Sequence, residues 1–158
     1  MTQLFGEKLR VLRQQHGLTQ AELAHRLGLA AHSHIAKLEN NHDAPSLILA
    51  LRVAYSFSVA LDYLIRDVQP VDQIIAFAID PSLGLPTAST LFSVKLRTLR
   101  QQRDVSQAVL SKHLGLSRQG YISNLETGRK APSLNLVVHI ADFFGVTTDY
   151  LLRDEIPV

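Results

Sequence analysis

The amino-acid sequence contains one long segment twice. Residues 4–71 return as residues 91–158 at a constant offset of 87 positions and without a gap, and about half of the paired positions are identical. Solenoid repeats run only roughly 20 to 50 residues, so a period of this length indicates a duplicated domain. We therefore predict copy one over residues 1–67, a partly apolar connector over residues 68–90, and copy two over residues 91–158.

The composition is that of a small globular protein rather than a membrane or disulfide-rich one. The chain has 158 residues, 46% of them hydrophobic, and no cysteine. The lack of cysteine excludes disulfides, thiolate metal sites and thiol nucleophiles, and it fits a reducing compartment. No run of about 18 apolar residues is present. We expect a cytoplasmic protein with no membrane contact and no cofactor.

The charge of the chain is distributed unevenly. The net charge is only +2, but the window Lys95–Lys130 holds eight basic and two acidic residues. The equivalent window of copy one, Lys8–Asp43, holds five basic and three acidic residues. A local excess of one sign gives a surface that attracts a polyanion. Copy two therefore has the stronger electrostatic case for binding nucleic acid.

Apolar residues recur at helical spacing in both copies, whereas strand-like alternation is scarce. Phe92, Leu96 and Leu99 follow the i, i+4, i+7 pattern of a first helix, which Asp104 ends in copy two and Gly17 ends in copy one. We predict an all-α fold with five helices in each copy.

Helix starts are marked by side chains that can accept hydrogen bonds from free amides. Thr19 opens the second helix of copy one with a capping-box sequence, and Ser106 keeps the cap in copy two. We expect Ser117 to open the third helix of copy two, where Ala30 of copy one cannot cap, and Ser133 to open the fourth. On a helical wheel, residues 118–127 separate an apolar face from a face of short, polar, uncharged side chains suited to reading base edges.

Several short motifs occur together in copy two. They are Leu96-Arg97-x-Leu99-Arg100, Ser106-Gln107-x-x-Leu110, Leu114-Gly115-Leu116-Ser117, Tyr121-Ile122-Ser123-Asn124-Leu125-Glu126-x-Gly128, Ala131-Pro132-Ser133-Leu134 and Phe144-Gly145-Val146-x-x-Asp149-Tyr150-Leu151-Leu152. Together they resemble the lambda-repressor-like helix-turn-helix family, also called XRE or Cro/CI, over essentially the whole of both copies. The resemblance implies two five-helix lambda-repressor-like DNA-binding domains in tandem. Both copies have one more residue between the glycine after helix two and the isoleucine of helix three than the commonest family spacing.

In that family the third helix enters the major groove of DNA, where each base pair presents a distinct pattern of donors and acceptors. The resemblance implies base contacts by Arg118, Gln119, Gly120, Ser123 and Asn124 in copy two and by His32, Ser33 and Lys37 in copy one. Glutamine and asparagine suit bidentate contacts to adenine. The alternative is an ordinary exposed helix face.

The resemblance also implies contacts to the phosphate backbone. They involve Gln107, Thr127, Arg129 and Lys130 in copy two and Gln20 and Asn40 in copy one. Such contacts position a protein without selecting sequence, and they make binding weaken steeply with salt. For the two glutamines, the alternative is a solvated side chain at the start of a helix.

Two arginine–glutamate pairs have the same sequence separation in both copies. They are Arg13 with Glu39 and Arg100 with Glu126. In the family these residues form a partly buried ion pair that ties helix one to helix three. We expect a structural role, because removing one partner strands the charge of the other.

Copy one departs from copy two at the positions expected to touch DNA. Its turn after helix three reads Asn40-Asn41-His42-Asp43 instead of Thr127-Gly128-Arg129-Lys130. Asparagine tolerates a left-handed backbone, so the fold survives while the phosphate contact weakens. We expect both copies to contact DNA, and the alternative that copy one serves packing or partner binding stays open.

The histidines of copy one could suggest a metal site. His32 and His34 point about 200° apart on a helix, which is poor geometry for one ion, and no carboxylate cluster accompanies them. We interpret them as surface residues and predict no metal site.

The connector contains an apolar run, Ile74–Ile79, that is too hydrophobic to remain in water. We expect it to pack on a domain or on a second chain. Its 23 residues from Val68 to Thr90 could extend roughly 75 Å, beyond the roughly 34 Å that separates half-sites one helical turn apart. The length therefore permits both copies to dock on one duplex.

These features predict a sequence-specific regulator of transcription, a repressor by preference, that reads double-stranded DNA at an asymmetric or two-part site. A homodimer through the connector or the fifth helix is left open. The competing hypothesis is a protein-interaction module, such as an antitoxin-like or anti-repressor partner, in which copy one does not read DNA. An enzyme is disfavoured because no nucleophile elbow, phosphate loop or metal-spaced motif is present.

Overall fold

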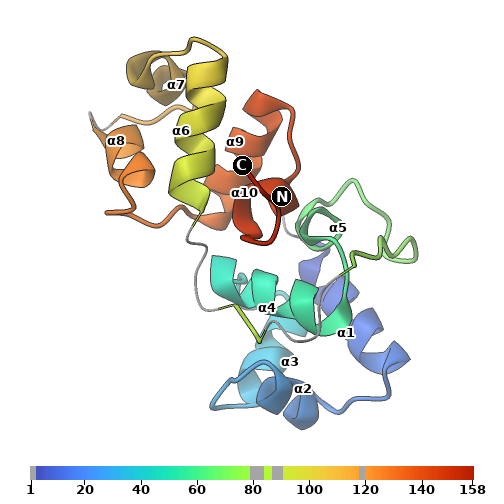
Figure 1. Cartoon of the computed structure of the whole chain (residues 1–158). Helices are drawn as coiled ribbons and strands as arrows, with labels where there is room; N and C mark the ends of the chain where they lie inside the picture. The colour runs from blue at the N-terminus through green and yellow to red at the C-terminus, as the bar shows by residue number, and fades with distance from the viewer. Residues whose placement is uncertain (1–2, 79–83, 87–90, 118–119) are drawn as a thin grey trace. The chain divides into compact units, whose positions relative to one another are not determined.

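The structure is a computed structural model that describes residues 3–78, 84–86, 91–117 and 120–158. The chain divides into two compact units, unit 1 (Met1–Thr87) and unit 2 (Ala88–Val158). The described residues of unit 1 form α1 (Phe5–Gln15), α2 (Gln20–Arg26), α3 (Ser33–Glu39), α4 (Leu47–Phe57) and α5 (Leu61–Ile65). Those of unit 2 form α6 (Phe92–Gln102), α7 (Gln107–His113), α8 (Tyr121–Glu126), α9 (Leu134–Phe144) and α10 (Thr148–Leu152) (Figure 1). The prediction of an all-α fold with five helices in each copy is confirmed.

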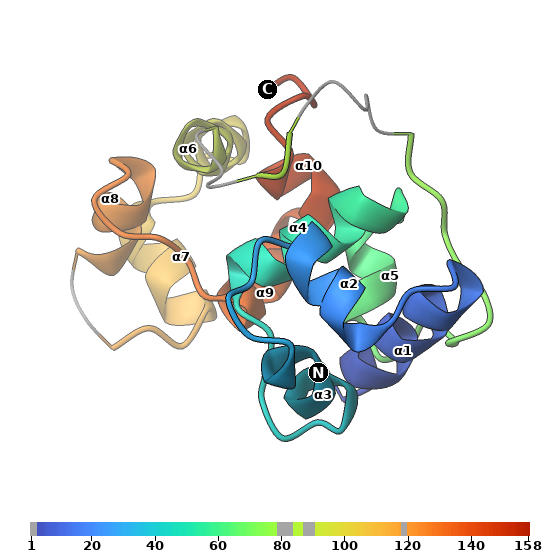
Figure 2. The same ribbon diagram turned by 90° about the horizontal axis from the view of Figure 1, so that it is seen from below.

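Each unit surrounds a core of leucine, isoleucine and phenylalanine side chains. In unit 2, α7 and α8 lie on one side of α6, and α9 and α10 lie on the other (Figures 1 and 2). Leu96 of α6 and Leu125 of α8 are fully buried, as are their counterparts Leu9 and Leu38 in unit 1. The core therefore fixes the third helix of each unit against the first, which is what holds a candidate reading helix in place.

The predicted caps at the second and fourth helices are present. Thr19 and Glu22 form a reciprocal capping box at α2, and the Ser106 hydroxyl accepts the amide of Val109 at α7. Ser133 accepts the amide of Leu136 at the start of α9. These bonds satisfy amides that have no partner within their own helix, so the helix starts are set locally by sequence.

The third helix of unit 2 begins later than the sequence predicts. Ser117 does not cap it. Gly120 occupies the N-cap position with φ +79° and no side-chain cap, and α8 starts at Tyr121. A left-handed backbone at Gly120 cannot continue a right-handed helix toward the N-terminus. Gly120 therefore precedes the helix and does not lie on its polar face.

The described part of the connector belongs to unit 1 and packs on residues of copy one. Ala60 donates its amide to Ile75 and Phe77 donates its amide to Ser58, which gives an isolated antiparallel bridge. Arg52 of α4 also donates to the carbonyl of Pro86 at 3.2 Å. These contacts of the described connector residues are to copy one, and packing on a domain was one of the two outcomes expected for the apolar run.

Candidate nucleic-acid interface

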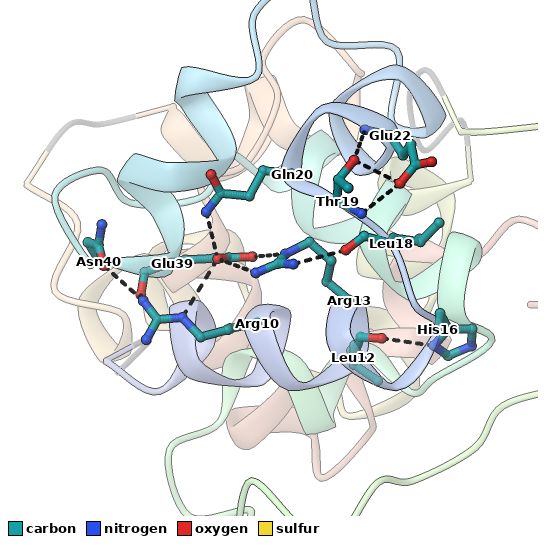
Figure 3. A network of polar contacts seen from close by, with 10 residues as sticks. All are labelled: Arg10, Leu12, Arg13, His16, Leu18, Thr19, Gln20, Glu22, Glu39 and Asn40. Carbon is teal, nitrogen blue, oxygen red and sulfur yellow. Dashed lines mark hydrogen bonds and ion pairs between the residues drawn. The ribbon is translucent and has the colours of Figure 1, made fainter.

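A polar network joins the first three helices of unit 1 (Figure 3). The Arg13 guanidinium from α1 makes two bonds to the Glu39 carboxylate of α3, Nε to Oε1 at 2.6 Å and Nη2 to Oε2 at 3.0 Å. Gln20 at the start of α2 donates to the same Oε2 at 3.0 Å. Glu39 is 4% exposed. The buried Glu39 carboxylate thus ties both α1 and α2 to α3, the helix that carries predicted base contacts of unit 1.

Unit 2 repeats this network with the equivalent residues. Arg100 Nε donates to Glu126 Oε1 at 2.5 Å, and its Nη2 donates to Oε2 at 3.0 Å. Gln107 donates to Glu126 Oε2 at 2.8 Å. The expected arginine–glutamate contacts are therefore present in both units. Gln20 and Gln107 were predicted to contact DNA phosphates. Each donates one hydrogen of its side-chain amide to the glutamate, and the amide group has a second hydrogen.

The network holds the glutamates in their charged form. Burial acts to raise the pKa of Glu126, but hydrogen bonds from Arg100 and Gln107 together with the Arg100 charge outweigh it, so the pKa is lowered. The same balance lowers the pKa of Glu39, with Arg13 and Gln20 as the donors. Each carboxylate is therefore a fixed anion that anchors cations from α1 or α6.

A second arginine from the first helix also reaches the end of the third, and sequence reasoning missed it. Arg10 donates to the Glu39 main-chain oxygen at 3.1 Å and to Asn40 Oδ1 at 2.8 Å. In unit 2, Arg97 donates to the Glu126 main-chain oxygen at 3.0 Å. The sequence carried a signal for this contact, because Arg10 and Arg97 recur at the same 87-residue offset that relates the two arginine–glutamate pairs.

The buried lysines were missed as well. Lys8 Nζ donates to the main-chain oxygens of Tyr63 at 2.6 Å and Arg66 at 2.9 Å, at the end of α5. Lys95 of unit 2 makes the same two bonds at the end of α10. Burial lowers the pKa of Lys8, which the nearby Asp67 carboxylate opposes. The sequence signal for this contact is a lysine beside the apolar face of the first helix, at the same position in both copies.

The polar face of α8 carries part of the predicted base-contact set. Ser123 and Asn124 are half-buried on α8, Gly120 is exposed just before it, and Ile122 and Leu125 are buried on the opposite face. Arg118 and Gln119 lie outside the described residues. A hollow of roughly 470 Å³ is lined by residues of α7, of α8 and of the segment between them, among them Gln107, Lys112, Ser117, Gly120 and Ser123.

The turn after α8 folds back onto the helix. Thr127 Oγ1 donates to the Ser123 carbonyl at 2.8 Å, so its proton is already used within the turn. The amide of Lys130 donates to the Asn124 carbonyl at 3.2 Å, and its ammonium lies 4.4 Å from the centroid of the Tyr121 ring. Arg129 is exposed. Two cations therefore stand beside the helix that carries the candidate base contacts.

The corresponding face of unit 1 is exposed but carries less positive charge. Of its predicted contact residues, His32, Ser33, Lys37 and Asn40 are exposed and Gln20 is half-buried. His32 occupies the N-cap of α3 without a side-chain cap. Asp43 lies exposed where unit 2 has Lys130. The two units thus present different chemistry from the same position of one scaffold.

Neither a cluster of metal ligands nor a membrane-spanning helix is present in the part of the chain that the structure describes. Within residues 3–78, 84–86, 91–117 and 120–158, no group of three or more histidine or acidic residues is placed to hold a metal ion. No helix among those residues is both long enough and apolar enough to cross a membrane.

The fold and this arrangement define a tandem helix-turn-helix protein. In each five-helix unit a short second helix is followed by a turn and by a third helix that is exposed on one side. The profile of the helix-turn-helix family matches the chain twice, over residues 9–64 and 96–151. Because the two matches cover most of the sequence, the chain belongs to this family, in its XRE-type branch.

Several proteins named as transcriptional regulators or repressors are similar to this chain. The SPbeta prophage-derived regulator YonR of Bacillus subtilis is 33% identical over 63 residues, which are 40% of this chain and 57% of that protein. The transcriptional repressor RstR of the cryptic phage CTXphi from Vibrio cholerae is 34% identical over 65 residues, 41% of this chain and 58% of that protein. The chain thus spans somewhat more than half the length of these two relatives.

An archaeal relative is close in size to a single copy. The regulator MJ0272 of Methanocaldococcus jannaschii is 46% identical over 63 residues, which are 39% of this chain and 94% of that protein. No solved structure matched the chain.

Proposed function

We propose that this protein is a sequence-specific DNA-binding regulator of transcription that acts as a repressor and reads a two-part, asymmetric site. The observation that carries the proposal is the α8 face of unit 2, where short polar side chains on an anchored helix lie beside the exposed turn bearing Arg129 and Lys130. Polar groups of this kind can read base edges, and the cations can hold the backbone on either side. The name of the Vibrio relative, a transcriptional repressor, supports the sign of regulation.

The asymmetry of the proposed site follows from the difference between the two faces. Unit 1 would present His32, Ser33 and Lys37 to a groove, whereas unit 2 would present Ser123 and Asn124. Two unlike readers in one chain bind two unlike half-sites, and the covalent link supplies a high effective concentration for the second contact. A homodimer that uses only unit 2 would instead bind a palindrome, and sedimentation of the DNA complex distinguishes one chain from two.

The test of base reading is the substitution Asn124→Ala. We expect it to change the preference among duplexes by about 1–3 kcal/mol at one base position, because a bidentate contact is lost. The measurement is competition binding of the full chain against a panel of duplexes, and Lys37→Ala is the matched change in unit 1. Unchanged discrimination between sites would remove Asn124 from the set of base contacts.

A second role for unit 1 is favoured by one observation. Its turn carries exposed Asp43 where unit 2 has a lysine, and a carboxylate there repels phosphate. Unit 1 would then bind a protein partner, as an anti-repressor or antitoxin-like module does. Under this proposal, Lys37→Ala leaves DNA binding by the full chain unchanged.

A further inference from the structure

A contact between an aromatic ring and a lysine is present in unit 2 and has no counterpart in unit 1. The Lys130 ammonium lies 4.4 Å from the centroid of the Tyr121 ring, and Tyr121 is the first residue of α8. Position for position, unit 1 has His34 and Asp43, which cannot form a lysine–aromatic contact. Both units nevertheless have the same main-chain hydrogen bond in this turn. The Asp43 amide donates to the Lys37 carbonyl, as the Lys130 amide donates to the Asn124 carbonyl. The difference therefore lies in the side chains.

We propose that Tyr121 is a positioning residue that holds Lys130 ready to bind a DNA phosphate next to the base-reading face of α8. This inference rests on the proposed function of unit 2. A lysine side chain is long and flexible, so fixing its ammonium before DNA arrives reduces the entropy lost on binding. The face of a tyrosine ring attracts a cation within about 6 Å without neutralising it, so the charge stays available to an anion.

The rest of the turn supports the same assignment. Lys130 is tied through its amide to Asn124, and Thr127 is tied through its hydroxyl to Ser123. The turn thus moves with the two residues proposed to read bases. Tyr121 belongs to the same helix. Lys130 is therefore held to α8 at two places, by its main-chain amide at Asn124 and by its ammonium at the Tyr121 ring. A phosphate bound there would set the register of α8 along the groove.

The experiment is a double-mutant cycle in the full chain, measured by fluorescence anisotropy with a mixed-sequence DNA duplex over a series of salt concentrations. Tyr121→Leu removes the ring face and Tyr121→Phe keeps it. We expect Tyr121→Leu to weaken binding by about two- to five-fold and Tyr121→Phe to restore it, which corresponds to an exposed cation–π contact. Lys130→Gln should lower the slope of log affinity against log salt by about 0.9, the value for one phosphate contact.

The coupling between the two changes decides the result. In the Lys130→Gln background, Tyr121→Leu should have no further effect, whereas in an Arg129→Gln background its full effect should persist. An equal loss from Tyr121→Leu in both backgrounds, or a Tyr121→Phe variant as weak as Tyr121→Leu, would overturn the positioning role while leaving DNA binding intact. Failure of the unaltered chain to bind the duplex in a salt-dependent way would overturn the proposed function and this inference together.

Discussion

Units 1 and 2 share a backbone more closely than they share residues. Four positions have a left-handed backbone in both units. One is a glycine in both copies, Gly28 and Gly115, and at the other three a glycine in one copy corresponds to a different residue in the other. The pairs are Gly17 with Asp104, Asn41 with Gly128, and Ser58 with Gly145. Since aspartate, asparagine and serine adopt this conformation less readily than glycine, the fold requires the conformation and tolerates several ways of reaching it.

The end of the fourth helix shows the same behaviour through longer side chains. In unit 1, Arg26 from α2 donates to the Ser56 carbonyl and lies over the Phe57 ring. In unit 2, Arg103 after α6 donates to the carbonyls of Phe143 and Phe144 and lies over the Phe144 ring. An arginine thus caps the helix in both units but comes from different elements. The scaffold is conserved as a set of contacts, and divergence is greatest at the face proposed for DNA.

The largest effect that could break this equivalence is expected at the buried carboxylates. Glu126→Gln removes the charge that pairs with Arg100 and leaves the guanidinium without its anion, so unit 2 should lose about 3 kcal/mol of stability. Glu39→Gln should cost unit 1 a similar amount. Hydrogen exchange resolved by peptide measures each unit within the intact chain. A loss confined to one of the two variants would mean that the networks are not equivalent.

The pH dependence provides a second readout of the same substitution. The pKa of each glutamate is lower in the folded state than its ordinary value, so its contribution is present above about pH 4.3 and is lost as the pH falls below that. In Glu126→Gln, unit 2 should therefore lose less stability than unit 1 between pH 5 and pH 3. Parallel losses in both units would contradict the lowered pKa of Glu126.

A smaller effect is expected where α1 approaches α3. A Cβ atom on Gly6 would lie 2.2 Å from the Leu38 carbonyl oxygen, a main-chain atom that cannot turn away. Gly6→Ala should destabilise unit 1 by about 1–3 kcal/mol through overpacking. Unit 2 has Ser93 at this position, so Ser93→Ala is the control and should change its stability little. Thermal unfolding checks both; an unaffected Gly6→Ala variant would show that the helices can separate without cost.

The smallest effect is expected from exchanging the residues that end the fourth helix. Ser58 has φ +52° and Gly145 has φ +62°. Ser58→Gly should stabilise unit 1 by about 0.5–1 kcal/mol, and Gly145→Ser should destabilise unit 2 by about the same amount. Urea unfolding of the two variants measures both signs. Two changes of the same sign would show that side-chain contacts rather than the backbone decide these positions.

The sequence predicted most of the scaffold because its signals are local or duplicated. The caps at Thr19, Ser106 and Ser133 depend on side chains and amides a few residues apart, so the sequence alone identifies them. The arginine–glutamate pairs were found because the same separation occurs twice.

What the sequence did not give depends on contacts in three dimensions. The start of α8 was misplaced because the left-handed conformation of Gly120 competes with a helix that Ser117 would otherwise cap. The lysine that binds the end of α5 is joined to it across 55 residues, and no local pattern shows where its ammonium lies. The Lys130–Tyr121 contact was missed for a similar reason, since it needs the turn to fold back on the helix.

The central claim is that one duplicated scaffold presents two different readers of DNA. Selection of bound duplexes from a random pool tests it most directly, with the full chain, with Asn124→Ala and with Lys37→Ala. We predict a two-part sequence whose halves differ, in which each substitution degrades only one half. A strict palindrome that Asn124→Ala abolishes and Lys37→Ala leaves unchanged would contradict the claim.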